Sequence, residues 1–278
     1  PWEQFLKPDG DIVSSEIDTL VFVLDGDLKS LPMGALWDPQ RQRYLLERYA
    51  IAVAPSLQLV QPQPLARPIR VLAAGSSDAL DHPLTDNTFP ALQGVREELM
   101  GIGRQVSTDT LLNESFTRPN LTEKLNAEPF DILHLATHGE FSSDPNRTFV
   151  MLSDAPLYAT ELDQLLRLNE NLQSPIEMIV LSACQTATGD NRAALGLAGL
   201  TLRAGAQSAL ATLWPVEDQS ASILMQEFYR QISTHPNISR AEALRRSQLN
   251  LWEEDTVHGK DWKTQSFWSP YVLVGNWL

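Results

Sequence analysis

Beyond residue 68, short β-rich runs alternate with longer amphipathic stretches, and this alternation limits the folds open to the chain. Runs expected as strands lie at 69–74, 130–138, 208–213, 271–274 and directly before Cys184, with a small hairpin at 149–158. Apolar residues at helical spacing predict helices over 92–102, 121–125, 160–168, 193–204, 219–232 and 239–252. Strands joined through helices need crossover connections. We therefore expect an α/β fold with a largely parallel, twisted sheet flanked by helices.

The first part of the chain has a different pattern. An apolar run at 19–24 ends in a turn signal, and further short strands are expected at 31–36 and 44–54. The segment 61–68 is rich in proline, whose ring holds the backbone extended. These features predict an N-terminal β-rich section over 1–66 and a second domain over 67–278.

Charge and cysteine usage limit the classes of function. The formal net charge is −14, from 35 acidic and 21 basic residues, and no basic stripe interleaves with aromatic residues, so we expect no nucleic-acid partner. The net negative charge either favours basic protein partners or only keeps the protein soluble. One cysteine fits a reducing compartment, and no apolar run is long enough to span a bilayer, so we expect a cytoplasmic protein without a membrane partner. The chain starts at Pro1, so we expect it to be part of something longer.

Two reactive side chains each follow a hydrophobic run. His138 ends the run that begins at Phe130, and Cys184, the only cysteine, follows the run that begins at Ile179. A thiol needs a base to become a strong nucleophile, and function collects at the carboxyl ends of parallel strands. The two residues are predicted to form one cysteine-hydrolase site. A buried, inert cysteine is the alternative, and Gly139 argues against it because glycine lets a backbone amide approach a substrate carbonyl.

The other histidines carry no comparable pattern. His134 lies inside the expected strand, so we interpret it as a buried, hydrogen-bonded core residue rather than a metal ligand. His82, His235 and His258 stand in polar, turn-like surroundings. The sequence also has no glycine loop for phosphate and no EF-hand spacing, so no cofactor and no metal are expected.

The order of these motifs resembles one family. Histidine precedes cysteine here, the reverse of papain-like proteases. The matching stretches are DGDLKSLPMGAL at 25–36, HLATHG at 134–139, LSACQT at 181–186, GLAGL at 196–200 with AGA at 204–206, LWPVED at 213–218 and SPYVLVG at 269–275. Together they resemble the CHAT domain, a caspase-like family related to separase and often found behind tetratricopeptide repeats in bacteria.

The resemblance implies a caspase-like catalytic domain over 67–278, with 1–66 as the N-terminal section of the CHAT region. It implies a cysteine peptidase in which His138 is the general base and acid and Cys184 the nucleophile. The amides of Gly139 and Cys184 would form the oxyanion hole. The partners implied are a protein or peptide substrate and an upstream repeat region or regulatory protein that controls activity.

The resemblance also bears on specificity. Metacaspase-like relatives carry an acid two residues before the cysteine, where this chain has Ser182. Asp218, with Glu217 beside it, resembles a separase stretch that supplies an acidic pocket residue, which implies cleavage after a basic residue. The alternative is that Asp218 only caps the helix expected from Gln219. Two other functions stay open: a catalytically silent scaffold or signalling module, and a thioesterase or transpeptidase using the same residues.

Overall fold

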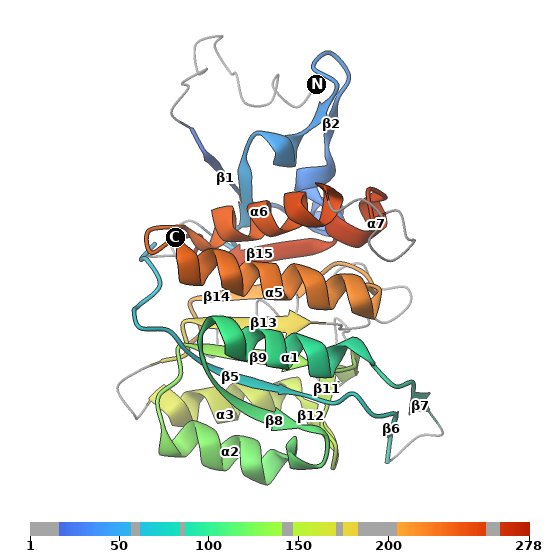
Figure 1. The fold of residues 1–278 in the computed structure, drawn as a ribbon, viewed down its shortest axis with the longest axis vertical. Helices are drawn as coiled ribbons and strands as arrows, with labels where there is room; N and C mark the ends of the chain where they lie inside the picture. Colours follow the sequence, from blue (N-terminus) through green and yellow to red (C-terminus); the bar gives the residue numbers. More distant parts are fainter. Residues whose placement is uncertain are drawn as a thin grey trace.

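The computed structural model describes residues 17–56, 62–83, 87–140, 147–170, 175–182, 205–253 and 262–278. One eight-stranded sheet forms its centre, in the order β1-β4-β15-β14-β13-β9-β5-β8 (Figure 1). The strands are β1 (Thr19–Phe22), β4 (Ala50–Val53), β15 (Tyr271–Gly275), β14 (Ser208–Thr212), β13 (Met178–Ser182), β9 (Ile132–Ala136), β5 (Arg70–Gly75) and β8 (Ser107–Leu112). Neighbouring strands are parallel except β14 and β15, which are antiparallel. The expected α/β fold with a largely parallel sheet is confirmed.

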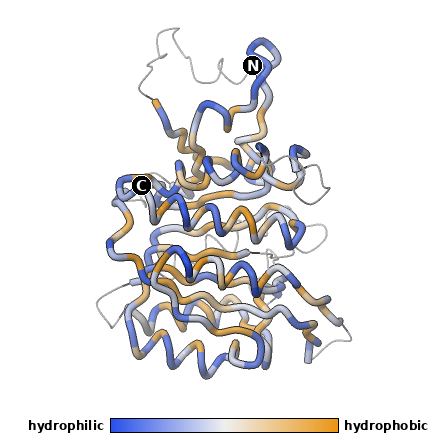
Figure 2. The backbone as a smooth tube through the Cα atoms, viewed as in Figure 1, coloured by the Kyte–Doolittle hydropathy of each residue, from blue (hydrophilic) through white to orange (hydrophobic). Residues whose placement is uncertain are grey.

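Helices cover both faces of this sheet (Figure 1). One layer contains α1 (Gly94–Gln105), α5 (Asp218–Thr234) and α6 (Arg240–Glu253), and the other contains α2 (Arg118–Ala127) and α3 (Ala159–Glu170). Side chains along β5 alternate between the two helix layers. Val71 and Ala73 pack with the first layer, and Leu72 and Ala74 pack with the second. The central strands are accordingly hydrophobic along much of their length (Figure 2).

Two small antiparallel units lie beyond the carboxyl ends of β5 and β9. The first is the hairpin of β6 (Leu80–Asp81) and β7 (Thr88–Phe89), which follows β5. The second is the sheet of β10 (Gly139–Glu140), β11 (Phe149–Met151) and β12 (Pro156–Tyr158), which confirms the hairpin expected at 149–158. In Figure 1 the β6–β7 hairpin projects from the edge of the molecule near the start of α1.

The N-terminal part differs from the sequence-based expectation. The strand expected at 31–36 is wrong: a 3-10 turn over Met33–Ala35 occupies it, closed by the Ala35 amide donating to the Pro32 carbonyl at 2.8 Å. The stretch 44–54 divides into a 3-10 turn over Leu45–Glu47 and then β4. Proline fixes its own backbone angle and donates no hydrogen bond, which favours the turn.

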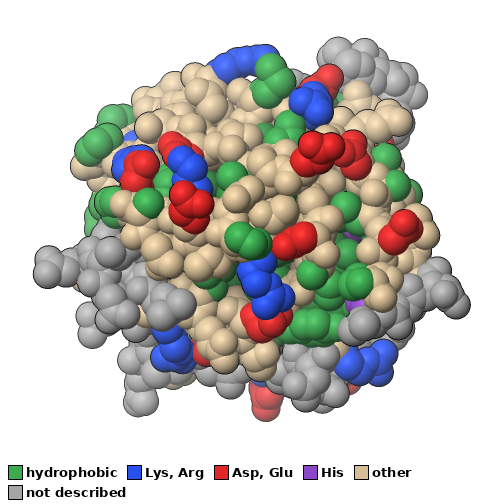
Figure 3. Space-filling view, turned by 90° about the horizontal axis from the view of Figure 1, so that it is seen from below, with side chains coloured by type: hydrophobic (Ala, Val, Ile, Leu, Met, Phe, Trp, Pro, Cys, Tyr) green, Lys and Arg blue, Asp and Glu red, His purple; other side chains and the backbone are tan. Residues whose placement is uncertain are grey.

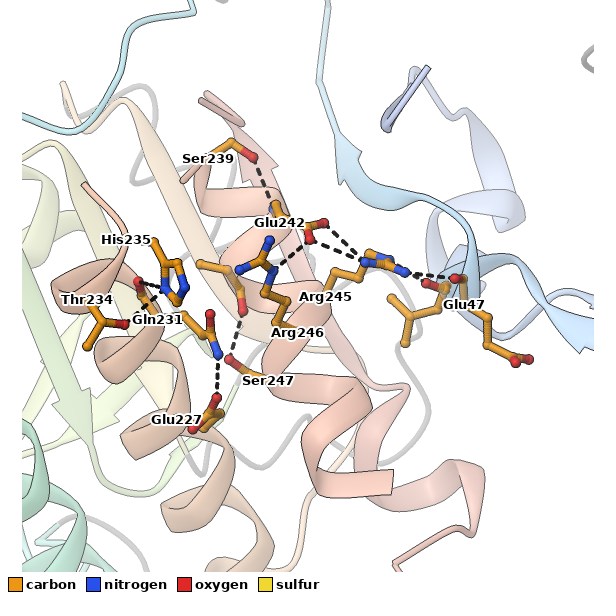
Figure 4. A network of polar contacts seen from close by, with 12 residues as sticks. Glu47, Glu227, Gln231, Thr234, His235, Ser239, Glu242, Arg245, Arg246 and Ser247 are labelled. Carbon is orange, nitrogen blue, oxygen red and sulfur yellow. Dashed lines mark hydrogen bonds and ion pairs between the residues drawn. The ribbon is translucent and has the colours of Figure 1, made fainter. Parts of the chain in front are cut away.

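This N-terminal part belongs to the main sheet, because β1 and β4 extend it through β15. A short hairpin of β2 (Trp37–Asp38) and β3 (Arg43–Tyr44) lies between them in sequence. Arg245 of α6 fastens the 3-10 turn after β3, because its Nε donates to Leu46 O at 2.8 Å and its Nη2 to Glu47 O at 2.7 Å (Figure 4). The domain boundary between residues 66 and 67 stays a prediction.

The chain ends with a short helix, α7 (Gln265–Trp268), followed by β15. Among the described helices, none combines the length and apolar character that crossing a membrane requires.

Candidate active site

His138 lies two residues beyond the end of β9 and directly before β10. Two hydrogen bonds to β11 hold its backbone. The Thr137 hydroxyl donates to Met151 O at 2.7 Å, and the Met151 amide donates to His138 O at 2.8 Å. The histidine is therefore presented from the sheet edge by a segment fixed to Met151 of β11.

The His138 ring is oriented by the segment before α1. Its Nε2 lies 2.7 Å from the Pro90 carbonyl oxygen. A carbonyl only accepts, so Nε2 carries the hydrogen and Nδ1 of the neutral ring keeps its lone pair. Phe89 stacks on the ring, with the centroids 5.2 Å apart and the planes 28° from parallel. The residue is 6% exposed, so its tautomer and direction are both set by protein contacts.

Burial lowers the pKa of His138, while the bond to Pro90 and the charge of Asp218 act in the opposite direction. The net shift is downward. A lowered pKa keeps the ring neutral at neutral pH, which a general base requires.

Asp218, the first residue of α5, contacts the same segment. Its Oδ2 accepts a hydrogen bond of 2.6 Å from the Gly94 amide at the start of α1. Its Oδ1 is buried and has no hydrogen-bond partner among the residues that the structure describes. Burial raises the pKa of Asp218, the charges of Glu98 and Glu217 add to this, and the Gly94 amide and His138 oppose it. The structure thus brings Asp218 within electrostatic reach of His138.

Glu217 occupies the capping position of α5. Its carboxylate accepts from the Ser220 amide at 2.9 Å, and its carbonyl accepts from the Ala221 amide at 3.0 Å. The alternative that Asp218 caps α5 is therefore wrong, because the helix begins one residue earlier than its apolar periodicity indicates. Asp218 instead binds the first amide of a different helix, α1.

The register of the neighbouring strand bears on Cys184. Ser182, the last residue of β13, pairs with Ala136, the last residue of β9. His138 follows Ala136 by two residues, and Cys184 follows Ser182 by two residues. Ser182 is fully buried. Cys184 lies outside the described residues, as does the helix expected over 193–204.

Gly139 begins β10 and pairs with Val150 of β11. It is buried and follows His138 directly, beyond the carboxyl end of β9. Toward the neighbouring hairpin, Phe149 contacts Phe89 edge to face, with the centroids 6.4 Å apart. The histidine therefore lies next to an apolar cluster contributed by β7 and β11.

His134 is the buried core histidine that the sequence predicts. Its Nε2 lies 2.8 Å from Glu98 Oε1, and its Nδ1 lies 3.2 Å from the Tyr229 hydroxyl. Within the described part of the chain, no group of three or more His, Cys, Asp or Glu side chains could hold a metal ion.

A groove of about 820 Å³ lies at the other end of α5, lined in part by Thr234, His235 and the start of α6. Since α5 has 17 residues, this groove is about 25 Å from Asp218 along the helix. Its arginines pair with acids: Arg246 Nε lies 2.8 Å from Glu242, which also pairs with Arg245 (Figure 4). The groove is separate from the candidate active site.

Acidic and basic side chains are mixed on the face of the molecule that Figure 3 shows. Figure 3 shows acidic and basic side chains interspersed on the face seen from below, with hydrophobic side chains gathered near exposed histidine atoms on its right. Among the described side chains visible on this face, the basic ones form no stripe of the kind that binds a phosphate backbone.

Comparisons with known proteins give matches over nearly the whole chain. The model of the CHAT domain family matches residues 2–276. Among curated proteins, tetratricopeptide repeat protein 28 of Mus musculus is 24% identical over 319 residues, covering 93% of this chain and 13% of the relative. The Homo sapiens protein of the same name is 21% identical over 309 residues, covering 92% of this chain and 12% of the relative. The chain thus spans about one eighth of these relatives.

Two solved structures share the fold. The crystal structure of the Arg-specific cysteine proteinase gingipain R superposes with a TM-score of 0.60 at 14% identity, covering 99% of this chain and 66% of that one. A complex of Porphyromonas gingivalis RgpB pro- and mature domains also gives a TM-score of 0.60 at 14% identity, covering 99% of this chain and 68% of that one. Identity this low supports the shared fold alone.

Proposed function

Because this chain belongs to the CHAT domain family, we propose that it is a cysteine endopeptidase working through a His138–Cys184 dyad. One observation carries the proposal. The His138 ring is fixed through Nε2 on Pro90 O, which leaves Nδ1 free to take a proton. Strands β9 and β13 end at paired residues, Ala136 and Ser182. His138 and Cys184 each follow by two residues, which supports a cysteine within reach of that nitrogen.

The reaction follows from these residue types. His138 Nδ1 takes the proton of the Cys184 thiol, and the thiolate attacks the scissile carbonyl to form a tetrahedral oxyanion. The amides of Gly139 and Cys184 are proposed to bind that oxyanion. The imidazolium then protonates the leaving amine, the C–N bond breaks, and water attacks the acyl-enzyme with His138 as base. The Pro90 carbonyl accepts from Nε2–H throughout and stabilises the imidazolium.

Substitution of the dyad tests this mechanism. Cys184→Ala should abolish peptide hydrolysis and labelling by a cysteine-directed probe, because no other thiol is present. His138→Ala should lower kcat at least a hundredfold with an unchanged circular dichroism spectrum, since general-base catalysis contributes about 10²–10⁴-fold. Absence of hydrolysis and of probe labelling in the native protein would favour a silent scaffold instead. Thioester turnover without peptide cleavage would favour the acyl-transfer alternative.

We propose further that the enzyme cleaves after a basic residue, with Asp218 as the binding carboxylate. Asp218 Oδ1 has no hydrogen-bond partner in the described part of the chain, although the atom is buried, so a guanidinium could provide one. Glu217 adds negative charge beside it. Ser182 stands two residues before Cys184, where metacaspase-like relatives carry an acid, so the basic preference is proposed to depend on Asp218 and not on that position. The Arg-specific gingipain shares the fold and is consistent with this choice.

Two neighbouring substitutions separate specificity from helix capping. Asp218→Ala should cut turnover of arginine peptides at least tenfold and spare neutral peptides, because loss of a buried charged partner costs about 2–5 kcal/mol. Glu217→Ala, the matched control, should lower the free energy of unfolding by about 1 kcal/mol and leave the preference largely intact. Peptide-library profiling and urea unfolding provide the measurements. Arginine preference that survives Asp218→Ala would assign the pocket to other residues.

Regulation from outside the chain is the last part of the proposal. The curated relatives are tetratricopeptide repeat proteins in which the matched region is about one eighth of the length. We propose on this basis that an upstream repeat region or a regulatory protein controls access to the site. The isolated chain should turn over peptide more slowly than the longer protein or its complex. Equal kcat values in the two forms would argue against such control.

We also propose that the protein lies in the cytoplasm, because a reducing compartment keeps a catalytic cysteine in its thiol form. Cell fractionation would test this.

A further inference from the structure

The start of α1 supports both residues of the candidate site through its backbone. The Pro90 carbonyl, four residues before the helix, accepts from His138 Nε2 at 2.7 Å. The Gly94 amide, the first of the helix, donates to Asp218 Oδ2 at 2.6 Å. The orientation of the general base and that of the proposed specificity acid therefore depend on the position of residues 90–94.

Glu98 anchors that helix start to the core. Its side chain is 1% exposed, and its Oε1 lies 2.8 Å from His134 Nε2 on β9. The opposite ring nitrogen of His134 lies 3.2 Å from the Tyr229 hydroxyl on α5. A carboxylate oxygen accepts, so His134 Nε2 carries the hydrogen. Burial and the charge of Glu98 raise the pKa of Tyr229 well above its usual value, so its hydroxyl keeps its proton and can donate to Nδ1. One polar cluster thus joins α1, β9 and α5.

We propose that Glu98 is a positioning residue for the catalytic site. By binding His134, it fixes the start of α1, which orients His138 and Asp218. The inference rests on the proposed function for its kinetic consequences, and its spectroscopic consequences are independent of turnover.

The chemistry of the cluster supports orientation rather than stability as the role of Glu98. A buried carboxylate is costly, and its Oε2 has no hydrogen-bond partner among the described residues. Val95 and Leu99, on the same helix, supply apolar packing against the core without that cost. Apolar contacts tolerate small rotations and slides of a helix, whereas a directional bond to His134 does not.

The geometry also gives a direct route from Glu98 to the site. Gly94 precedes it by four residues, so the two lie on one helix face, about 6 Å apart along the axis. A glycine at 94 lets α5 approach, because a Cβ there would lie 2.9 Å from the Asp218 carbonyl oxygen and 2.9 Å from its Oδ1. With contacts this close, a small displacement of the helix start changes the Asp218 contact.

Four variants test the proposal. Glu98→Ala removes the bond to His134, and Glu98→Gln keeps an oxygen that accepts from His134 Nε2. Leu99→Ala removes a buried apolar contact from the same turn and serves as the control for lost stability, while Glu97→Ala alters an exposed acid beside it. All are assayed below their unfolding temperatures with arginine and neutral peptides, and ¹⁵N NMR reports the tautomer of His138.

We expect Glu98→Ala to lower kcat about tenfold or more and to reduce the arginine-to-neutral ratio of kcat/KM, because misplacement by 1 Å is enough for a hundredfold loss. Its His138 should exchange between tautomers, whereas the native protein should show the Nε2–H form. Glu98→Gln should recover most of both losses. Leu99→Ala should lower the melting temperature while keeping kcat, the ratio and the tautomer, and Glu97→Ala should change none of them.

Equal losses of kcat in Leu99→Ala and Glu98→Ala would overturn the proposal, because lost stability would then explain both. An unchanged His138 tautomer in Glu98→Ala would overturn it as well. The NMR arm needs no substrate, which separates this inference from the proposed function. If the native protein hydrolysed no peptide but only Glu98→Ala altered the tautomer, the peptidase proposal would fail and the positioning role would stand.

Discussion

At the scale of single residues, two opposing influences act on His138. Burial removes water from around the ring and disfavours its charged form, so the pKa falls. The Pro90 carbonyl and the Asp218 carboxylate favour the charged form but do not outweigh burial. The net downward shift suits catalysis, because the base starts neutral and can accept the proton of the thiol.

This balance predicts how His138 titrates. In Cys184→Ala protein, where no thiol interferes, the NMR titration midpoint of His138 should lie below the ordinary pKa of about 6.5. Asp218→Asn should lower that pKa further, because it removes a charge that raises it. Asp163→Asn, on the opposite helix layer, should leave it unchanged. Because unfolding restores the ordinary value, acidification below about pH 6.5 should also destabilise the protein through this residue. A midpoint above that of a free histidine would contradict the burial argument.

At the scale of elements, local sequence predicts most of the fold because buried strands and amphipathic helices carry strong patterns. The runs before His138 and Cys184 become β9 and β13. Five of the six expected helices become α1, α2, α3, α5 and α6, and the sixth, over 193–204, lies outside the described residues. The edge strand β8 has no such pattern, since Ser107–Leu112 mixes threonine and aspartate with two leucines and lies at the rim of the sheet. Its pairing with β5, not its composition, makes it a strand.

The sequence predicts those residues of the candidate site that act through their side chains, but not those that act through their backbone. His138 could be located because it follows a hydrophobic run, and Asp218 because its surroundings resemble a known pocket. Pro90 and Gly94 contribute a carbonyl and an amide, which every non-proline residue also has, so sequence alone gives no signal for them. Glu98 does carry a signal: a glutamate between Val95 and Leu99 interrupts the apolar face of α1, which marks a buried polar contact.

At the scale of the whole molecule, Arg240 ties together segments that are distant in sequence. It is 1% exposed, and its guanidinium donates to Gln63 O at 2.9 Å, to Glu177 Oε2 at 2.9 Å and to the carbonyl of Leu278. The proline-rich segment 61–68, the residue before β13, helix α6 and Leu278 therefore meet at one buried cation. Burial lowers the pKa of Arg240 to about 10, and the charge of Glu177 opposes that shift.

Arg240→Gln should therefore destabilise the fold well beyond the effect of a surface charge. It leaves the Glu177 carboxylate, whose pKa burial already raises, without its cation, and breaking a buried pair costs about 3–5 kcal/mol. Arg246→Gln is the matched control on the same helix: its side chain is 42% exposed and pairs with Glu242 at 2.8 Å. Such surface pairs contribute about 0–1 kcal/mol. Urea unfolding of both variants measures the difference. A loss for Arg240→Gln as small as that for Arg246→Gln would mean that the proline-rich segment 61–68 and Leu278 are held by their other contacts, with the buried cation adding little.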